Sequence, residues 1–215
     1  MRVPQREGAR GSLRWLQTAI NRSPEILDSP AIGPIKWLSP LSADDYAEYS
    51  DETFLDLLGL SSLRNTLGDF WPRRGPRWDA LGRSGKTVII AEAKAHIGEF
   101  LSTATTAKGE SRTKIERSLS ETRAALGATG NADWSQCFYQ YTNRLAHLHF
   151  LRTHGVDARL LLIGFVGDTE MSGPDTKEEW SAAYRVANHA LGIGSRHSLS
   201  AFIHHAYPDV RLLHR

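Results

Sequence analysis

Residues 77–96 read RWDALGRSGKTVIIAEAKAH, and this stretch predicts a β-hairpin. The dipeptide Ser84-Gly85 suits a two-residue hairpin turn, because glycine accepts the positive φ that such turns require. Residues 88–91 read VIIA, and this β-branched, apolar composition is typical of a buried strand. The two halves of the stretch are therefore expected to pair as neighbouring strands of a sheet.

Two carboxylates and an ammonium come together in the predicted hairpin. Side chains alternate along a strand, so Glu92 and Lys94 fall on one face. With the turn at residues 84–85, Asp79 lies opposite Ile90 and is a diagonal neighbour of Glu92, with Cβ atoms roughly 5–8 Å apart. Two carboxylates this close repel each other unless a cation lies between them. The hairpin therefore predicts a cation site near its open end.

The three groups suit the hydrolysis of a phosphodiester. Hard oxygen ligands from two carboxylates, completed by water and a backbone carbonyl, match Mg²⁺ or Mn²⁺. Such a metal lowers the pKa of a bound water and offsets charge on the phosphate, while a nearby ammonium orients the attacking water. The alternative interpretation of Glu92 and Lys94 is a surface ion pair at the end of a strand.

The spacing of these residues resembles that of the PD-(D/E)XK, or restriction-endonuclease-like, nucleases. Asp79 is followed, after twelve residues, by Glu92-Ala93-Lys94, with strand, turn and strand between them and a helix afterwards. The resemblance implies a three-layer α/β/α sandwich around a mixed sheet. It also implies that Asp79, Glu92 and the carbonyl of Ala93 bind the metal and that Lys94 assists catalysis.

Two further positions are implied by the resemblance. Members of the family often add a glutamate from a helix before the hairpin, and Glu48 is preferred here over Glu52. Many also carry a polar residue, typically Gln, on a helix after the core, and Gln140 matches it. The sequence departs from the family pattern at Trp78, where a Pro is usual, and at Arg144, where a Tyr commonly follows the Gln.

Basic residues gather around the predicted hairpin. Arg73, Arg74 and Arg77 precede Asp79, and Arg144 lies near the predicted site on a helix. A local basic field attracts a polyanion, so we expect these four arginines to contact nucleic acid, with DNA as the preferred polymer. The alternative interpretation is a solvated loop, and the formal net charge of +2 does not decide between them.

The remaining sequence predicts an α/β protein with a mixed sheet. Frequent Pro and Gly in residues 1–40 predict an irregular N-terminal arm, followed by a single nuclease-like domain over residues 41–215. Apolar periodicity predicts the other elements. Helices are expected over residues 42–58, 61–70, 111–126, 134–153 and 176–191, and strands over residues 77–83, 86–96, 159–166 and 199–206.

Composition limits the remaining classes of protein. The single cysteine, Cys137, excludes an intrachain disulfide framework, indicates a reducing, cytoplasmic compartment and is interpreted as a core residue. No apolar run is long enough to cross a bilayer, so no membrane partner is expected. A zinc site is not favoured, because His147 and His149 point to different sides of their predicted helix.

Three functions remain after this reasoning. The first is a metal-dependent, endonuclease-like hydrolysis of nucleic acid. The second is a non-catalytic nucleic-acid-binding or assembly module with the same fold, and the third is a small-molecule phosphohydrolase that uses the same carboxylates. A homodimer is left open as the assembly that would cut both strands of a duplex.

Overall fold

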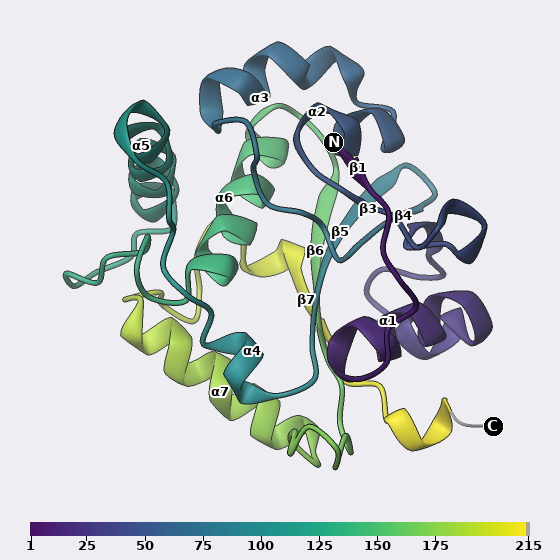
Figure 1. Cartoon of the computed structure of the whole chain (residues 1–215). Helices are drawn as coiled ribbons and strands as arrows, with labels where there is room; N and C mark the ends of the chain where they lie inside the picture. Colours follow the sequence, from purple (N-terminus) through teal and green to yellow (C-terminus); the bar gives the residue numbers. More distant parts are fainter. Residues whose placement is uncertain (214–215) are drawn as a thin grey trace.

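A five-stranded mixed sheet forms the centre of the computed structural model, which describes residues 1–213 (Figure 1). Its strand order is β2-β4-β5-β6-β7, with antiparallel pairing from β2 to β5 and parallel pairing from β5 to β7. The predicted α/β class with a mixed sheet is therefore confirmed. The strands are β2 (Lys36–Ser39), β4 (Ala80–Ser84), β5 (Thr87–Lys94), β6 (Ala158–Gly164) and β7 (Ile203–Ala206).

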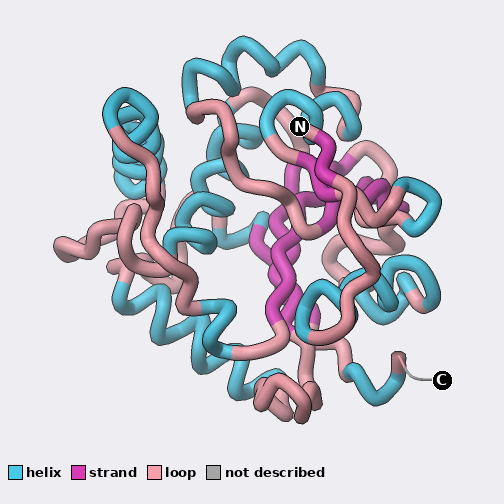
Figure 2. The backbone as a smooth tube through the Cα atoms, viewed as in Figure 1, coloured by secondary structure: helices cyan, strands magenta, loops and turns pink. Residues whose placement is uncertain are grey.

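Helices cover both faces of the sheet, which Figures 1 and 2 show close to edge-on. One face packs against helices on the side of α6 and α7, and the other packs against α1. The helices are α1 (Gly11–Arg22), α2 (Asp51–Leu57), α3 (Arg64–Phe70), α4 (Ile97–Phe100), α5 (Gly109–Ala125), α6 (Tyr139–Thr153) and α7 (Lys177–Ala190). Among residues 1–213, none of them combines the length and apolarity that crossing a bilayer requires.

Strand β5 divides its side chains between the two layers of core. Val88 and Ile90 belong to the core on the α6 side, whereas Ile89 and Ala91 belong to the core on the α1 side. This confirms the predicted alternation, and it places Glu92 on the α6 side of the sheet. Both faces of β5 are apolar. This composition suits a strand that lies between β4 and β6 and is covered by helices on both sides.

The turn of the hairpin lies one residue later in the sequence than predicted, and this changes which residues of the two strands are paired. Ser84 pairs with Thr87, so the turn comprises Gly85 and Lys86, and Gly85 takes the positive φ of 58°. Glycine in the first position of a two-residue turn is typical of type II′ hairpins. The observed pairing continues to Ala80 opposite Ala91. Asp79 therefore comes level with Glu92 instead of diagonal to it.

The prediction of an irregular arm over residues 1–40 is wrong where α1 and β2 form. Prolines and glycines flank α1, but within it Trp15, Leu16 and Ala19 form a buried apolar stripe against the sheet. Such a stripe stabilises a helix by packing against the rest of the fold. The frequency of Pro and Gly, on which the prediction of an irregular arm was based, does not report this packing. Strand β2 then joins the edge of the sheet by pairing with β4.

The prediction of a helix over residues 42–58 is confirmed only for its second half, α2. Asp45 and Tyr46 have positive φ values of 52° and 49°, which interrupt a helix. The chain then forms a short strand, β3 (Glu48–Tyr49), which pairs with β1 (Arg2–Val3). Glu48 therefore reaches the site from a strand, and the predicted helical position for it is wrong.

The later elements lie close to their predicted ranges. Helix α7 begins with a capping box between Thr176 and Glu179, and Gly155 follows α6 with a φ of 77°. Helix α6 begins five residues later than predicted, at Tyr139, because residues 134–138 form turns. The final strand is shorter than predicted, since a 3₁₀ turn takes up residues 200–202.

Candidate metal and nucleic-acid site

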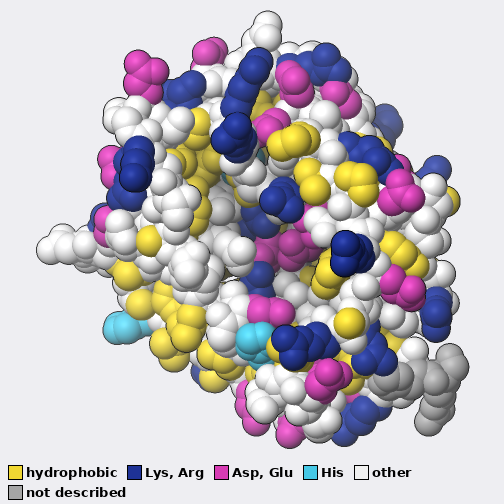
Figure 3. All heavy atoms as spheres, viewed as in Figure 1, with side chains coloured by type: hydrophobic (Ala, Val, Ile, Leu, Met, Phe, Trp, Pro, Cys, Tyr) yellow, Lys and Arg dark blue, Asp and Glu magenta, His cyan; other side chains and the backbone are white. Residues whose placement is uncertain are grey.

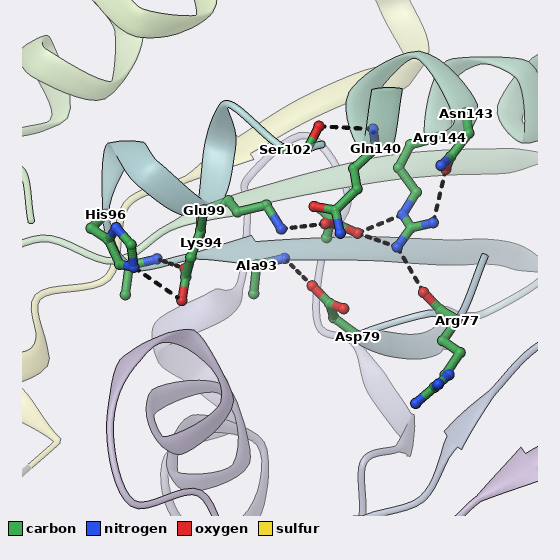
Figure 4. A network of polar contacts seen from close by, with 12 residues as sticks. Arg77, Asp79, Ala93, Lys94, His96, Glu99, Ser102, Gln140, Asn143 and Arg144 are labelled. Carbon is green, nitrogen blue, oxygen red and sulfur yellow. Dashed lines mark hydrogen bonds and ion pairs between the residues drawn. The ribbon is translucent and has the colours of Figure 1, made fainter. Parts of the chain in front are cut away.

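Asp79 lies at the point where β4 begins and faces the neighbouring strand. Its Oδ2 accepts a hydrogen bond from the backbone N–H of Ala93 at 2.8 Å (Figure 4). The N–H and C=O of one strand residue point to the same side, so the carbonyl of Ala93 faces the same gap. No hydrogen bond to Oδ1 of Asp79 is found within residues 1–213. Within these residues, one oxygen of the Asp79 carboxylate is thus available to a ligand, and the carbonyl of Ala93 points into the same gap.

Glu92 is buried between two cationic side chains. Its side chain is on the α6 side of β5, and the residue is only 3% exposed. Oε1 accepts from Nζ of Lys94 at 2.5 Å, and Oε2 accepts from Nε of Arg144 at 2.5 Å. A buried carboxylate needs such partners, because burial without them would carry a large desolvation cost. Both oxygens of Glu92 are therefore engaged.

Arg144 was expected among residues that contact nucleic acid, and its ion pair with Glu92 was missed. The guanidinium also donates to the backbone carbonyl of Arg77 at 2.7 Å and to Oδ1 of Asn143 at 2.9 Å. It lies 4.6 Å from the centre of the Trp78 ring. No local pattern in the sequence marks this pair, because a buried arginine finds its anion across the fold.

Burial and neighbouring charge separate the pKa values of the two carboxyls. Burial, together with the negative charge of Glu92, raises the pKa of Asp79 to about 7, although Lys94 and Arg144 oppose this. Burial alone would raise the pKa of Glu92, but the cations Arg144 and Lys94 outweigh it and lower that pKa. Burial lowers the pKa of Lys94, yet attraction to Glu92 and Asp79 prevails and raises it. Glu92 and Lys94 are thus an ionised pair.

Glu48 is the third carboxylate near the site. It lines the same cavity as Asp79, and its Oε2 accepts a hydrogen bond from Nε2 of Gln5 at 2.9 Å. Burial raises its pKa, against the opposing charge of Arg77. The structure thus places Glu48 in the same cavity as Asp79, on a strand instead of the predicted helix.

Gln140 lies in the first turn of α6 and reaches toward the sheet. Its backbone N–H donates to Oγ of Ser102 at 3.1 Å, which ties the segment after α4 to α6. Figure 4 shows the Gln140 side chain extending from α6 toward Lys94 and Asp79. The structure therefore brings Asp79, Lys94 and Gln140 to one place, as the sequence predicted.

Two cavities meet at Asp79. The larger, about 730 Å³, is lined by Asp79, Glu48 and Gln140 and by a set of basic residues. The smaller, about 490 Å³, is lined by Asp79, Lys94 and Gln140. The basic residues of the larger cavity are Arg73, Arg74, Arg77, Lys108 and Arg144. We call the two cavities together the cleft.

The cleft combines an acidic floor with a basic rim. Figure 3 shows acidic side chains in a central hollow with Lys and Arg side chains around it. Arg73, Arg74 and Arg77 are exposed at this rim. Among the aromatic side chains of this region, Trp78 and Tyr141 are buried in the core, whereas Tyr139 is half-buried and lines the cleft.

The donor set fits a hard divalent cation in kind. Within residues 1–213, no three His, Cys, Asp or Glu side chains gather as a metal site. Asp79 and the carbonyl of Ala93 nevertheless direct hard oxygens into the same gap, and oxygens of this kind suit Mg²⁺ or Mn²⁺. Both oxygens of Glu92 already contact a cationic side chain, so a metal there would share this carboxylate with Lys94 or Arg144.

Glu99 also lines the smaller cavity. Its Oε1 lies 3.6 Å from Nε2 of His96, and its Oε2 accepts a hydrogen bond from the N–H of Ala95. Cys137 is exposed, so its interpretation as a core residue is wrong. It lies in the turns before α6, where its side chain meets no layer of core.

Comparisons with known proteins give no match among family models, curated proteins or solved structures.

Proposed function

We propose that the protein is a metal-dependent nuclease that hydrolyses phosphodiester bonds in nucleic acid, with DNA as its first candidate substrate. The observation that carries this proposal is the position of Asp79. It has a free carboxylate oxygen at the junction of two cavities, beside Lys94, under a rim of arginines. Negative charge at the floor suits a cation, and positive charge at the rim suits a polyanion.

Asp79, the carbonyl of Ala93 and Glu92 would hold the metal. A divalent cation there would lower the pKa of a bound water and offset negative charge on the scissile phosphate. Lys94 presents an ammonium to the smaller cavity, where it can orient a water and stabilise charge on the phosphate. Gln140 lines both cavities and can position the substrate by hydrogen bonds.

The rim supplies affinity for the substrate. Arg73, Arg74, Arg77 and Lys108 all line the larger cavity. Contacts of this kind bind phosphates without reading sequence. Tyr139 offers a half-buried ring in the same cavity, on which a base can stack.

The proposal is tested by incubating the protein with single-stranded, duplex and branched DNA and with RNA, in Mg²⁺, Mn²⁺ or EDTA. Cleavage is expected with the metals and not with EDTA. Asp79→Asn should abolish it, because the amide removes the anionic ligand and keeps the shape. Asp175→Asn, at an exposed position outside the cleft, is the matched control. Equal cleavage by Asp79→Asn and the native chain would refute the proposal.

The engagement of Glu92 favours a second candidate function. Because Lys94 and Arg144 already neutralise this carboxylate, the fold is complete without a metal. A non-catalytic nucleic-acid-binding module with the same cleft would bind DNA in a salt-dependent way and cut nothing. Binding without cleavage in either metal, across all the substrates above, is the result that identifies it.

A further inference from the structure

Arg144 is a buried cation of the site to which the proposed chemistry gives no task. The residue is 3% exposed, and its guanidinium approaches Oε2 of Glu92 through both Nε and Nη2, each at 2.5 Å. Two N–H groups directed at one carboxylate form a strong, charge-assisted contact. Any cation that binds Oε2 of Glu92 must therefore displace or share this guanidinium.

Above pH 7, where Asp79 as well as Glu92 is ionised, the charges of the site balance without a metal. Asp79 and Glu92 then carry two negative charges, and Lys94 and Arg144 carry two positive charges. Without Arg144, the same cluster would carry a net negative charge and would attract a divalent cation more strongly. Because the cluster is largely buried, water screens these charges weakly. Arg144 thus opposes the binding of a metal beside Glu92.

Arg144 also faces the proposed substrate. It lines the larger cavity together with Arg73, Arg74 and Arg77. A phosphate in that cavity would offer the guanidinium a second anion, with a geometry that matches its donors. The phosphate of the substrate would then bind the guanidinium in place of Glu92. One oxygen of Glu92 would become available to the metal.

We propose that Arg144 is a positioning residue that takes the place of a divalent cation on Glu92 and so sets the affinity of the site for metal. In the free protein the metal binds weakly. It binds tightly when a phosphate of the substrate replaces Glu92 as the ion-pair partner of Arg144. The inference rests on the proposed function, since it assumes that Glu92 is a metal ligand. It assigns the departure from the family pattern at this position a physical consequence.

The test is calorimetric titration of the native protein with Mn²⁺, beside Arg144→Gln and Arg144→Lys. Arg144→Gln removes the charge and keeps a donor, so it should bind Mn²⁺ at least about tenfold more tightly. Arg144→Lys keeps the charge and should stay close to the native affinity. Arg185→Gln, which removes an exposed charge on α7 outside the cleft, should change nothing.

Three outcomes separate this inference from the proposed function. Tighter binding in Arg144→Gln alone supports both. Equal binding by the native protein, Arg144→Gln and Arg144→Lys overturns the role of Arg144 and leaves the metal site standing. Mn²⁺ binding to none of the forms overturns the proposed function, and this inference with it.

A measurement on the native protein covers the case in which Arg144→Gln does not fold. Arginine Nε–H signals in ¹⁵N NMR report each guanidinium, and the signal of Arg144 is assigned through its loss in Arg144→Lys. Addition of Mg²⁺ should move this signal together with the backbone amide of Ala93, which contacts Asp79. A shift at Ala93 with no change at Arg144 would overturn the inference.

Discussion

Arg144 and Glu92, which are 52 residues apart in the sequence, form a buried ion pair in which Nε and Oε2 lie 2.5 Å apart. The pair joins α6 to the central strand β5, and Lys94 completes it from the same strand. Glu92, which is proposed to bind a metal, therefore also holds two layers of the fold together. Its removal is expected to affect stability as well as activity.

Glu92→Ala should destabilise the protein by about 3–5 kcal/mol, because it leaves Lys94 and Arg144 buried without their shared anion. Urea unfolding in EDTA at neutral pH measures the loss. Glu116→Ala removes an exposed carboxylate that pairs with Arg112 on α5, and it should cost no more than about 0.5 kcal/mol. Similar losses for the two variants would show that the buried pair contributes little to stability.

Replacing Arg73 and Arg74 together by Gln should weaken DNA binding and lower its dependence on salt. Each phosphate contact contributes about 0.9 to the slope of log K against log salt, so the double variant should lose roughly 2. Fluorescence anisotropy at several salt concentrations measures this slope. The pair Arg185→Gln and Arg196→Gln, both exposed and outside the cleft, is the control. An unchanged slope in the rim variant would place the DNA elsewhere.

His147 should make the protein less stable in acid. It is 1% exposed among the rings of Phe54, Phe70, Trp71 and Trp78, and burial lowers its pKa to about 3. Below pH 6.5 the unfolded chain binds a proton that the folded chain excludes. Stability is therefore lost as pH falls from about 6.5 toward 3, by up to about 1.4 kcal/mol per pH unit.

His147→Phe should remove this loss, because phenylalanine does not titrate. The free energy of unfolding of the native chain should fall by about 2–3 kcal/mol more than that of the variant between pH 7 and pH 4.5. Urea unfolding at the two pH values measures the difference. His189→Phe, at an exposed position on α7, should leave the native pH dependence unchanged. Parallel pH profiles for the native chain and His147→Phe would contradict the prediction.

Two glycines should respond in opposite directions to alanine. A Cβ on Gly164, at the end of β6, would lie 2.8 Å from Cγ of Trp180, whose Nε1 is held by the carbonyl of Phe165. Gly164→Ala should therefore cost about 1–3 kcal/mol. A Cβ on Gly68 in α3 would meet nothing within 4 Å, so Gly68→Ala should stabilise by roughly 0.5–1 kcal/mol. Thermal unfolding of both variants decides the signs.

Local patterns predicted the elements that carry the site. The alternation along β5 placed Glu92 and Lys94 on one face, and the structure confirms that face. The turn was misplaced by one residue, because Ser84-Gly85 and Gly85-Lys86 both offer glycine to a tight turn. Pairing across the sheet, which a single strand does not reveal, decided between them.

The position of Glu48 could not be read from its neighbours in the sequence. A rough apolar stripe over residues 42–58 resembled one helix, whereas positive φ at Asp45 and Tyr46 breaks it. The strand that holds Glu48 pairs with Arg2–Val3, so its form depends on a segment more than forty residues away. Contacts of this range override local propensity.

The sequence by itself determined the α/β class, the presence of the hairpin and the placing of Glu92 and Lys94 on one face of a strand, because side-chain periodicity and turn chemistry act over a few residues. Tertiary structure decided that Asp79 lies level with Glu92, that α1 covers one face of the sheet, that Glu48 lies on a strand and that Arg144 forms an ion pair with Glu92. Those features arise when apolar faces pack and buried charges find partners across the fold, so distant parts of the chain must first come together.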